Sequence, residues 1–354
     1  MPHDPNNVVR VNPNEPQTGV IKRAAEVLQH GGLVAFPTET VYGLGAHALD
    51  VAAVREIFSA KERPEWDPLI VHVADIAMAQ MLVTRTPPAF DELAKKFWPG
   101  PLTLVVYKAA HVPDEVTARR NTVALRQPRH PVASALLAEA QLPIAAPSAN
   151  RFGRPSPTRA QHVVEDLGNR VDLILDAGPT PLGVESTVLD LTQSPPAILR
   201  PGGVSLEELE AVLGPVTMSK CVTDQVEVKG LRGPGMTAKH YAPSATVELF
   251  DGEPSDMARQ MAERADALHR QGKKVGAIVS EEMRNAVESH TQLVACFGAW
   301  GAWEALARKL FGVLRVLDSQ GVDVILCPLP PAKGLAMALR DRLQRAAGGS
   351  SERK

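Results

Sequence analysis

Residues 61–73 read KERPEWDPLIVHV, a stretch that sets two basic side chains and two prolines directly before an apolar strand. Proline fixes φ near −65° and stiffens the loop, while PLIVHV has the length and composition of a buried strand. Lys61 and Arg63 in such a loop suggest a site for an anion. Taken alone, a solvated basic loop is the commoner explanation, so the surrounding sequence has to distinguish the two.

Apolar runs of the same kind alternate with helical patterns from about residue 18 to 213. The expected strands are LVAF (33–36), PLIVHV (68–73), LTLVVY (102–107), TVALR (122–126), PIAA (143–146), LILD (173–176), STVLDL (186–191) and AILR (197–200). The expected helices are 18–30, 50–59 with Asp50 as its N-cap, 75–83, 88–97, 131–140, 158–167 and 205–213. Many short strands with interleaved helices predict a three-layer α/β domain, α+β in some schemes, over residues 1–213.

The pattern changes after this domain. Residues 214–244 have no clear period and include PGMTAKHYAP, so they predict a linker. From 245 to 348 the order is βαββαβα, with strands ATVELF, KVGAIVS, TQLVACF and VDVILCPL and helices 255–271, 300–319 and 333–347. This order predicts a small Rossmann-like α/β domain with a parallel sheet. It has neither a G-x-G-x-x-G motif nor a P-loop, so it is not expected to hold a nucleotide site of its own.

Composition limits the class of protein. A chain of 354 residues with 44% hydrophobic and 22% charged residues predicts a soluble protein of two domains. Residues 1–210 hold 19 basic and 24 acidic side chains, a net of −5, which argues against a basic nucleic-acid-binding body. No apolar run could span a membrane, the polar N-terminus lacks a signal-peptide core, and Cys221, Cys296 and Cys327 are too scattered for a disulfide framework. We therefore expect a cytoplasmic location.

The segment FPTETVYGLGAHA (36–48) follows the first expected strand. Thr38 would stand at the end of that strand, and Gly43 and Gly45 allow the backbone to approach another group closely. One interpretation is a tight strand-to-helix turn. The other is a polar floor for a small ligand.

Three strands carry polar side chains that need an explanation. His72 lies between Val71 and Val73; such a histidine is more often a satisfied core residue, but in a cleft it could hold a carboxylate. Arg126 and Arg200 each end an apolar strand, where a guanidinium is costly unless it meets an anion. The planar guanidinium suits a carboxylate bidentately.

The segment IAAPSANRFGRPSPT (144–158) is the richest in polar groups. Ser148 and Asn150 stand two apart, so in an extended backbone they point to the same side, and Ser186 precedes a further strand. Hydroxyl, amide and backbone N–H groups together can cradle an oxyanion or phosphate. The sequence has no nucleophile-elbow triad, no Cys–His pair and no metal-ligand cluster. The basic and polar residues therefore favour catalysis by positioning and charge neutralisation, as in adenylyl or phosphoryl transfer.

These stretches together resemble the YrdC-like family of threonylcarbamoyl-AMP synthases in their long, two-domain form. The matching motifs are FPTETVYGLG, KERP with PLIVHV, WPGPLTLV, ALRQP, APSAN, GVESTV and ILRPG, and they cover residues 18–213 almost without a gap. The linker and GLAMALRDRLQRAA near the C-terminus resemble the long form's linker and second domain. The resemblance implies a twisted mixed sheet around a basic cavity.

The resemblance also implies an activity. L-Threonine, bicarbonate and ATP would be combined into threonylcarbamoyl-AMP with release of pyrophosphate, which is a nucleotidyltransferase reaction. A separate transferase would then carry the threonylcarbamoyl group to the adenosine beside the anticodon of tRNA, so tRNA is an indirect partner. Magnesium is expected with ATP, without a protein-built metal site, and no membrane partner is expected.

Residue roles follow from the same resemblance. Lys61 and Arg63 would be catalytic, meeting the ATP phosphates and neutralising charge as pyrophosphate leaves. The further residues expected around ATP are Thr122, Ser148, Asn150, Ser156, Arg200, His240 and Tyr241. The residues expected around threonine are Thr38, His72, Arg126, Ala146 through its backbone, and Ser186. Arg126 would take the carboxylate, and the linker with His240 and Tyr241 would fold over the cavity mouth.

Asp67 departs from the family, which often has Asn at this position. A carboxylate near a triphosphate would be repulsive unless it faced magnesium or solvent. Two other functions stay open. One is an RNA-binding module, against which the acidic balance of residues 1–210 counts. The other is a carbamoyl-transfer enzyme of hydrogenase maturation, whose acylphosphatase-like region and Cys-rich zinc motifs this sequence lacks.

Overall fold

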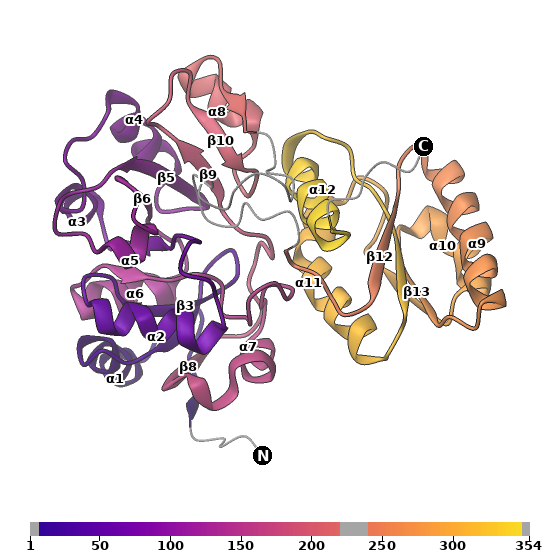
Figure 1. Ribbon diagram of the computed structural model, residues 1–354, viewed down its shortest axis with the longest axis horizontal. Helices are drawn as coiled ribbons and strands as arrows, with labels where there is room; N and C mark the ends of the chain where they lie inside the picture. Colours follow the sequence, from indigo (N-terminus) through magenta and orange to yellow (C-terminus); the bar gives the residue numbers. More distant parts are fainter. Residues whose placement is uncertain (1–6, 220–239, 349–354) are drawn as a thin grey trace. The chain divides into compact units, whose positions relative to one another are not determined.

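The computed structural model describes residues 7–219 and 240–348. It divides into two compact units (Figure 1). The first comprises Met1–Phe152 and Ser156–Met236, and the second comprises Gly153–Pro155 and Thr237–Lys354. Each unit has a sheet of its own.

The first unit is built on a mixed sheet. Its strands are β1 (Val8–Arg10), β2 (Val34–Pro37), β3 (Tyr42–His47), β4 (Ile70–His72), β5 (Leu102–Tyr107), β6 (Thr122–Arg126), β7 (Ile144–Ala145), β8 (Leu173–Asp176), β9 (Thr187–Asp190), β10 (Ala197–Arg200) and β11 (Thr217–Met218). Their spatial order is β1-β8-β2-β3-β7-β4-β6-β5-β9-β10-β11. The sheet contains parallel pairs such as β4 with β6 and antiparallel pairs such as β4 with β7, so it is mixed, as predicted.

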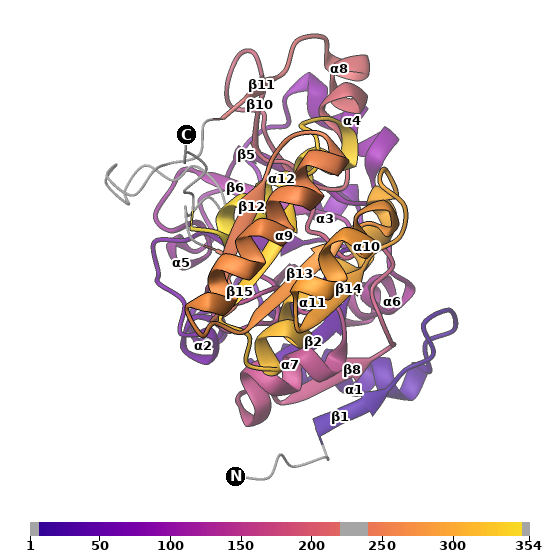
Figure 2. The ribbon, with the colours of Figure 1, turned by 90° about the vertical axis from the view of Figure 1, so that its right-hand side faces the viewer.

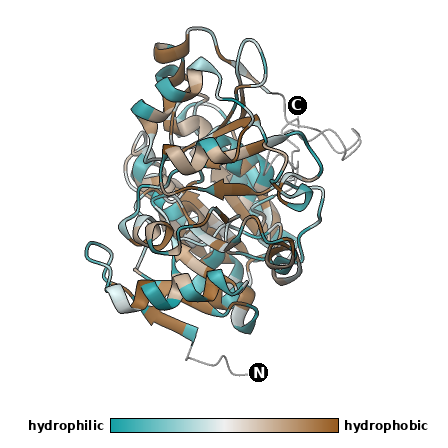
Figure 3. Cartoon of the chain, turned by 90° about the vertical axis from the view of Figure 1, so that its left-hand side faces the viewer, coloured by the Kyte–Doolittle hydropathy of each residue, from teal (hydrophilic) through white to brown (hydrophobic). Residues whose placement is uncertain are grey.

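Helices cover both faces of this sheet. They are α1 (Thr18–Gln29), α2 (Val51–Lys61), α3 (Ile76–Met81), α4 (Pro88–Phe97), α5 (Asp114–Thr117), α6 (Pro131–Ala140), α7 (Ala160–Leu167) and α8 (Leu206–Leu213), with a 3-10 turn at η2 (Gly168–Arg170). Strand β2 shows the two-sided burial: Val34 and Phe36 join the core with α1 and α6, while Ala35 joins the core with α2 and α7. Figure 3 shows the apolar strands at the centre and mixed polar and apolar residues on the helices. The three-layer prediction is confirmed.

Local signals placed most helices correctly. Asp50 caps α2 as predicted, because its side chain accepts hydrogen bonds from the N–H groups of Ala52 and Ala53. Helix α2 ends at Lys61, and Glu62 follows in a left-handed conformation with φ 53°. Lys61 is therefore the last helical residue and not part of a loop.

The interpretation of FPTETVYGLGAHA as a strand-to-helix turn is wrong. The second half of the segment is strand β3, which pairs antiparallel with β2. Glycine disfavours strands, which is why periodicity missed this one. A Cβ added at Gly45 would lie 2.7 Å from the Phe36 ring and 2.8 Å from Ile144, so the glycine is required by close packing inside the sheet.

The second unit holds a parallel sheet, as predicted. Its strands β12 (Thr246–Phe250), β13 (Val275–Val279), β14 (Leu293–Cys296) and β15 (Val324–Pro328) lie in the order β12-β15-β13-β14. Figures 1 and 2 show α9 (Pro254–Arg270) and α10 (Glu281–Val287) on one face, and α11 (Trp303–Ser319) and α12 (Gly334–Ala346) on the other.

The predicted order βαββαβα lacked one helix. Parallel neighbours such as β13 and β14 need a crossover connection, and α10 with the 3-10 turn η4 (Glu288–His290) provides it. Helix α10 has seven residues and buries only Met283 and Val287 within the core, too few to establish a helical period in the sequence. In the part of the chain that the structure describes, no helix is both long and apolar enough to cross a membrane.

Candidate active site

The first cluster of predicted site residues lies around Lys61. Its side chain is buried, and its ammonium donates to the backbone carbonyls of Ser148 and Asn150. The Asn150 N–H donates to the Ser148 carbonyl at 3.0 Å, so the segment forms a tight turn and not the extended backbone expected from the sequence. The turn directs both carbonyls toward the cation.

The lysine lies in an unusual electrostatic environment. Burial, and secondarily the charge of Arg63, hold the pKa of Lys61 well below its ordinary value, while Asp166 and Asp67 act in the opposite direction. Among the described residues, only the two carbonyls hydrogen-bond to the ammonium. A buried cation without a carboxylate in contact is costly unless an anion approaches it.

Arg63 is fixed by its own loop. Its Nη2 lies 2.9 Å from the Asp67 carboxylate and donates to the Pro68 carbonyl at 3.0 Å, while Nε donates to the Asp67 carbonyl. The guanidinium also stands 5.8 Å from the centre of the Phe152 ring, within cation–π range. Asp67 is fully buried. The role that the sequence left open for Asp67 is thus that of ion-pair partner of Arg63, away from solvent.

His72 and Arg126 form the second cluster. They are register partners at the carboxyl ends of the parallel strands β4 and β6. His72 is buried with its ring edge-on to Phe36 at 6.2 Å, and neither ring nitrogen has a hydrogen-bond partner among the described residues. Burial, and then the charge of Arg126, hold the pKa of His72 well below its ordinary value. The imidazole is therefore neutral beside the guanidinium.

Glu39 was missed as a site residue. Its Oε1 lies 2.7 Å from Nη2 of Arg126, and its Oε2 accepts a hydrogen bond from the backbone N–H of Arg129 at 3.0 Å. Nε of Arg126 donates to the Gly100 carbonyl at 3.1 Å. The sequence predicted that Arg126, a buried arginine at a strand end, needs an anion, and Glu39 of the protein itself provides a carboxylate for it. The available signal was a glutamate in an otherwise apolar and threonine-rich turn.

Thr38 and Ser186, which are expected to bind the substrate threonine, lie on two segments that are joined by a hydrogen bond. Thr38 closes the turn after β2 by donating to the Val41 carbonyl, and the N–H of Leu182 donates to the Glu39 carbonyl. Ser186 follows this segment and shares a 2.8 Å hydrogen bond with Thr103.

Arg200 and Ser156 meet the same segment. Nη2 of Arg200 donates to the Ser186 carbonyl at 2.9 Å, and Ser156 donates to the Glu185 carboxylate. Two residues expected around ATP therefore contact the segment that carries Ser186, which is expected around threonine.

Strand β4 connects the two clusters. His72 is at its carboxyl end, and the loop with Arg63 precedes its amino end. The antiparallel strand β7 runs back along it, and Ala146 donates its N–H to the Ile70 carbonyl on the way to the Ser148 turn. Thr122 begins β6 at the amino end, level with the Arg63 loop. The clusters thus lie at opposite ends of one three-residue strand.

His240 and Tyr241 belong to the second unit. Their rings are edge-on at 4.1 Å, and Tyr241 is buried against Phe311 at 5.4 Å and the Arg342 guanidinium at 5.1 Å. Tyr241 has φ 62°, a left-handed conformation that a tyrosine adopts only when its surroundings hold it. Residues 220–239 of the expected linker lie outside the described residues, so its closure over the cavity stays a prediction.

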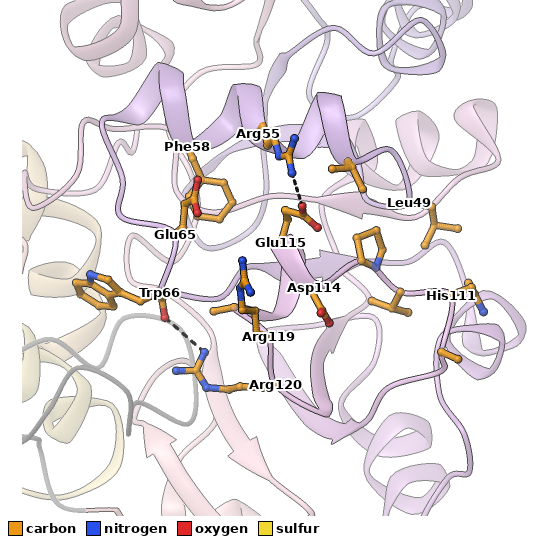
Figure 4. A pocket seen from close by; sticks show the side chains of 15 residues that line it. Leu49, Arg55, Phe58, Glu65, Trp66, His111, Asp114, Glu115, Arg119 and Arg120 are labelled. Carbon is orange, nitrogen blue, oxygen red and sulfur yellow. Dashed lines mark hydrogen bonds and ion pairs between the residues drawn. The ribbon is translucent and has the colours of Figure 1, made fainter.

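A separate pocket of about 1070 Å³ lies beside α2 and α5 (Figure 4). Arg55 and Glu115 pair across it at 2.8 Å, and Arg120 donates to the Trp66 carbonyl at 3.4 Å. None of the predicted site residues lines it. Its acidic and basic side chains are balanced, so it is a poor site for a polyanion.

The described residues contain no group of three or more His, Cys, Asp or Glu side chains that could hold a metal ion. The two buried carboxylates of the clusters, Glu39 and Asp67, are each engaged by an arginine.

Two family models match the chain, and together they define its class. The model described as "Telomere recombination", named for Sua5, YciO and YrdC, matches residues 26–202. The model described as "Threonylcarbamoyl-AMP synthase, C-terminal domain" matches residues 204–348.

Relatives and solved structures narrow the class. The chain is 46% identical to the threonylcarbamoyl-AMP synthase of Pyrococcus abyssi, with 93% of this chain and 94% of the relative aligned. It is 44% identical to that of Bacillus subtilis, over 95% and 94%. The crystal structure of P. abyssi Sua5 complexed with L-threonine matches with a TM-score of 0.89 at 43% identity, over 96% and 97% of the two chains. The chain therefore belongs to the Sua5/YrdC family of threonylcarbamoyl-AMP synthases.

Proposed function

We propose that the protein makes threonylcarbamoyl-AMP from L-threonine, bicarbonate and ATP. The amine of threonine and bicarbonate would form an N–C bond with loss of water to give the carbamate, whose carboxylate oxygen attacks the α-phosphorus of ATP. The bond from that phosphorus to the bridging oxygen breaks, and pyrophosphate leaves. The observation that carries the proposal is the occurrence of two buried clusters at the two ends of β4, one with Lys61 and Arg63 and the other with Arg126 and His72, which suits a reaction between an amino acid and a nucleotide. Such a site works by holding two reactants in line.

The threonine would lie at the carboxyl ends of β4 and β6. Arg126 would bind its carboxylate, and the neutral His72 would hydrogen-bond to it without repelling the guanidinium. Thr38, Ser186 and the backbone of Ala146 would contact the rest of the amino acid.

The triphosphate would lie at the amino end of β4. Lys61 and Arg63 would neutralise the charge that develops on pyrophosphate, the main electrostatic task of such a step. The nucleotide contacts would be completed by Thr122, Ser148, Asn150, Ser156, Arg200, His240 and Tyr241. Binding of ATP would also favour the charged form of Lys61, because an anion compensates for its burial.

The remaining features are proposals of the same kind. Magnesium would accompany ATP, and the reaction would belong to the nucleotidyltransferases. A threonylcarbamoyl transferase would consume the product for tRNA modification in the cytoplasm. The catalytic domain would end near residue 213, with a linker to residue 244 that closes over the nucleotide.

One experiment tests the proposal directly. The protein is incubated with ATP, L-threonine and bicarbonate, and the adenylate is sought by mass while pyrophosphate is assayed. We expect stoichiometric adenylate and pyrophosphate that both need all three substrates. Pyrophosphate without the adenylate, or no dependence on threonine, would contradict it. Isotopic bicarbonate identifies the carbamoyl carbon.

A further inference from the structure

The guanidinium of Arg126 is held along one edge only. Nε donates to the Gly100 carbonyl, and Nη2 lies 2.7 Å from Oε1 of Glu39 in an ion pair that makes no hydrogen bond. Among residues 7–219 and 240–348, the Gly100 carbonyl is therefore the hydrogen-bond acceptor that the guanidinium uses. The side chain is buried, so the hydrogen bond to Gly100 and the ion pair with Glu39 restrict where the guanidinium can lie. The unused donor edge is then aimed in one direction before any ligand arrives.

Glu39 is itself firmly placed. Its Oε2 accepts from the Arg129 N–H, its backbone carbonyl accepts from the Leu182 N–H, and its side chain is almost fully buried. Arg129 is only three residues from Arg126, so the carboxylate bridges the arginine and the backbone that follows β6. A second, unpartnered polar group lies alongside, since both ring nitrogens of His72 lack hydrogen bonds within the described residues.

Two other roles for Glu39 are less consistent with this geometry. A general base must present an oxygen to the substrate proton, but one oxygen faces Arg126 and the other accepts from Arg129. A simple counter-ion would need only proximity. The backbone hydrogen bond to Oε2 adds orientation, which a counter-ion does not require.

We infer that Glu39 is a positioning residue: it orients Arg126 so that the unused edge of the guanidinium selects amino acids with a free α-carboxylate. The inference rests on the proposed function, because it assumes that Arg126 binds the carboxylate of threonine. According to this inference, the preference of the site for a free α-carboxylate depends on Glu39. The neutral carboxylate–guanidinium pair also limits how tightly any other small anion is held.

The test compares L-threonine with L-threoninamide, which lacks the carboxylate charge. The variant Glu39→Gln keeps the side-chain length, but its amide places an N–H against either Arg126 or Arg129. Calorimetry with wild type should give at least tenfold tighter binding of threonine than of threoninamide. In Glu39→Gln we expect threonine to weaken about tenfold and threoninamide to stay unchanged, so that the ratio approaches one. Affinity for ATP should be unchanged, and Glu56→Gln on the exposed face of α2 is the matched control.

A second variant covers loss of folding. Glu39→Asp keeps the negative charge but is one methylene too short to hold Nη2. The ratio of threonine affinity to threoninamide affinity should therefore fall in this variant too, although Arg126 still has a carboxylate nearby. An unchanged ratio in the folded Glu39 variants, or tighter binding of threonine to Glu39→Gln, would overturn the inference. The latter would mean that Glu39 merely competes with the substrate.

Arg126→Ala distinguishes failure of the proposed carboxylate site from failure of the positioning role of Glu39. If it leaves threonine affinity unchanged, the proposed carboxylate site is wrong. If it abolishes the preference for threonine while the Glu39 variants retain it, Arg126 binds the carboxylate and only the positioning role of Glu39 fails.

Discussion

Two buried arginine–carboxylate pairs in the described part of the first unit are built in different ways. Arg63 pairs with Asp67 four positions later within one loop, at 2.9 Å. Arg126 pairs with Glu39 at 2.7 Å across the sheet, from the end of β6 to the turn after β2. The first pair shapes a loop, whereas the second joins two distant segments. The ion pair at the amino end of β4 therefore joins residues close in sequence, whereas the pair at its carboxyl end joins residues far apart in sequence.

Lys61 should show the largest effect, since it has no carboxylate in contact and depends on the ligand for charge compensation. Lys61→Met keeps most of the side-chain volume but removes the charge. Pyrophosphate release should fall about a hundredfold, as expected for a lost transition-state contact of about 2–4 kcal/mol. Lys22→Met on the exposed face of α1 should leave the rate unchanged. Near-normal turnover in folded Lys61→Met would remove Lys61 from the chemistry.

The two pairs should differ in their contribution to stability. Glu39→Ala leaves the Arg126 guanidinium buried without its carboxylate and with the Gly100 carbonyl as its remaining contact, a loss that typically costs about 3–5 kcal/mol. Asp67→Ala should cost less, about 2 kcal/mol, because Arg63 keeps the Pro68 carbonyl and the Phe152 ring. Urea unfolding followed by tryptophan fluorescence measures both free energies of unfolding. Equal losses would erase the distinction between a local and a tertiary pair.

The carboxyl end of β4 should make stability depend on pH. The pKa of His72 is well below 6.5 in the folded protein because the ring is buried, whereas the unfolded chain titrates near 6.5. As pH falls below 6.5, the unfolded state binds a proton that the native state does not, so stability is lost. From pH 6.5 to 5.5 the loss should be roughly 1 kcal/mol.

The variant His72→Asn isolates this contribution. The pKa values of His47 and His130 are also lowered, chiefly by burial, and both residues are retained in the variant. The difference between wild type and His72→Asn in the pH dependence of unfolding therefore reports His72. Parallel curves for the two proteins would show that His72 is not buried in the neutral form.

An exposed pair provides the lower limit of the comparison. Arg55 and Glu115 lie 2.8 Å apart, but the Arg55 side chain is 65% exposed. Solvent screens such pairs, so Arg55→Ala should change the free energy of unfolding by less than about 0.5 kcal/mol. A loss as large as that of Asp67→Ala would mean that burial does not govern these pairs.

The same contrast decides what the sequence could predict. The Asp50 cap and most helices depend on neighbouring residues, and these predictions agree with the structure. Strand β3 was missed because its glycines remove the alternating pattern, and α10 because it is short.

Contacts between residues far apart in sequence could not be predicted from neighbouring residues. The pairing of Glu39 with Arg126 depends on the order of β2 and β6 in the sheet, and the register of His72 opposite Arg126 depends on strand pairing. Asp67 could have been assigned, since it stands four residues after Arg63.

The central claim is that the two ends of β4 hold different substrates. Calorimetry of Arg63→Ala and Arg126→Ala, each with ATP and with L-threonine, tests it most directly. We predict that Arg63→Ala weakens ATP binding about tenfold or more and leaves threonine binding intact, while Arg126→Ala does the reverse. If both variants weaken both ligands equally, or if the two losses are exchanged, the assignment of the clusters is contradicted.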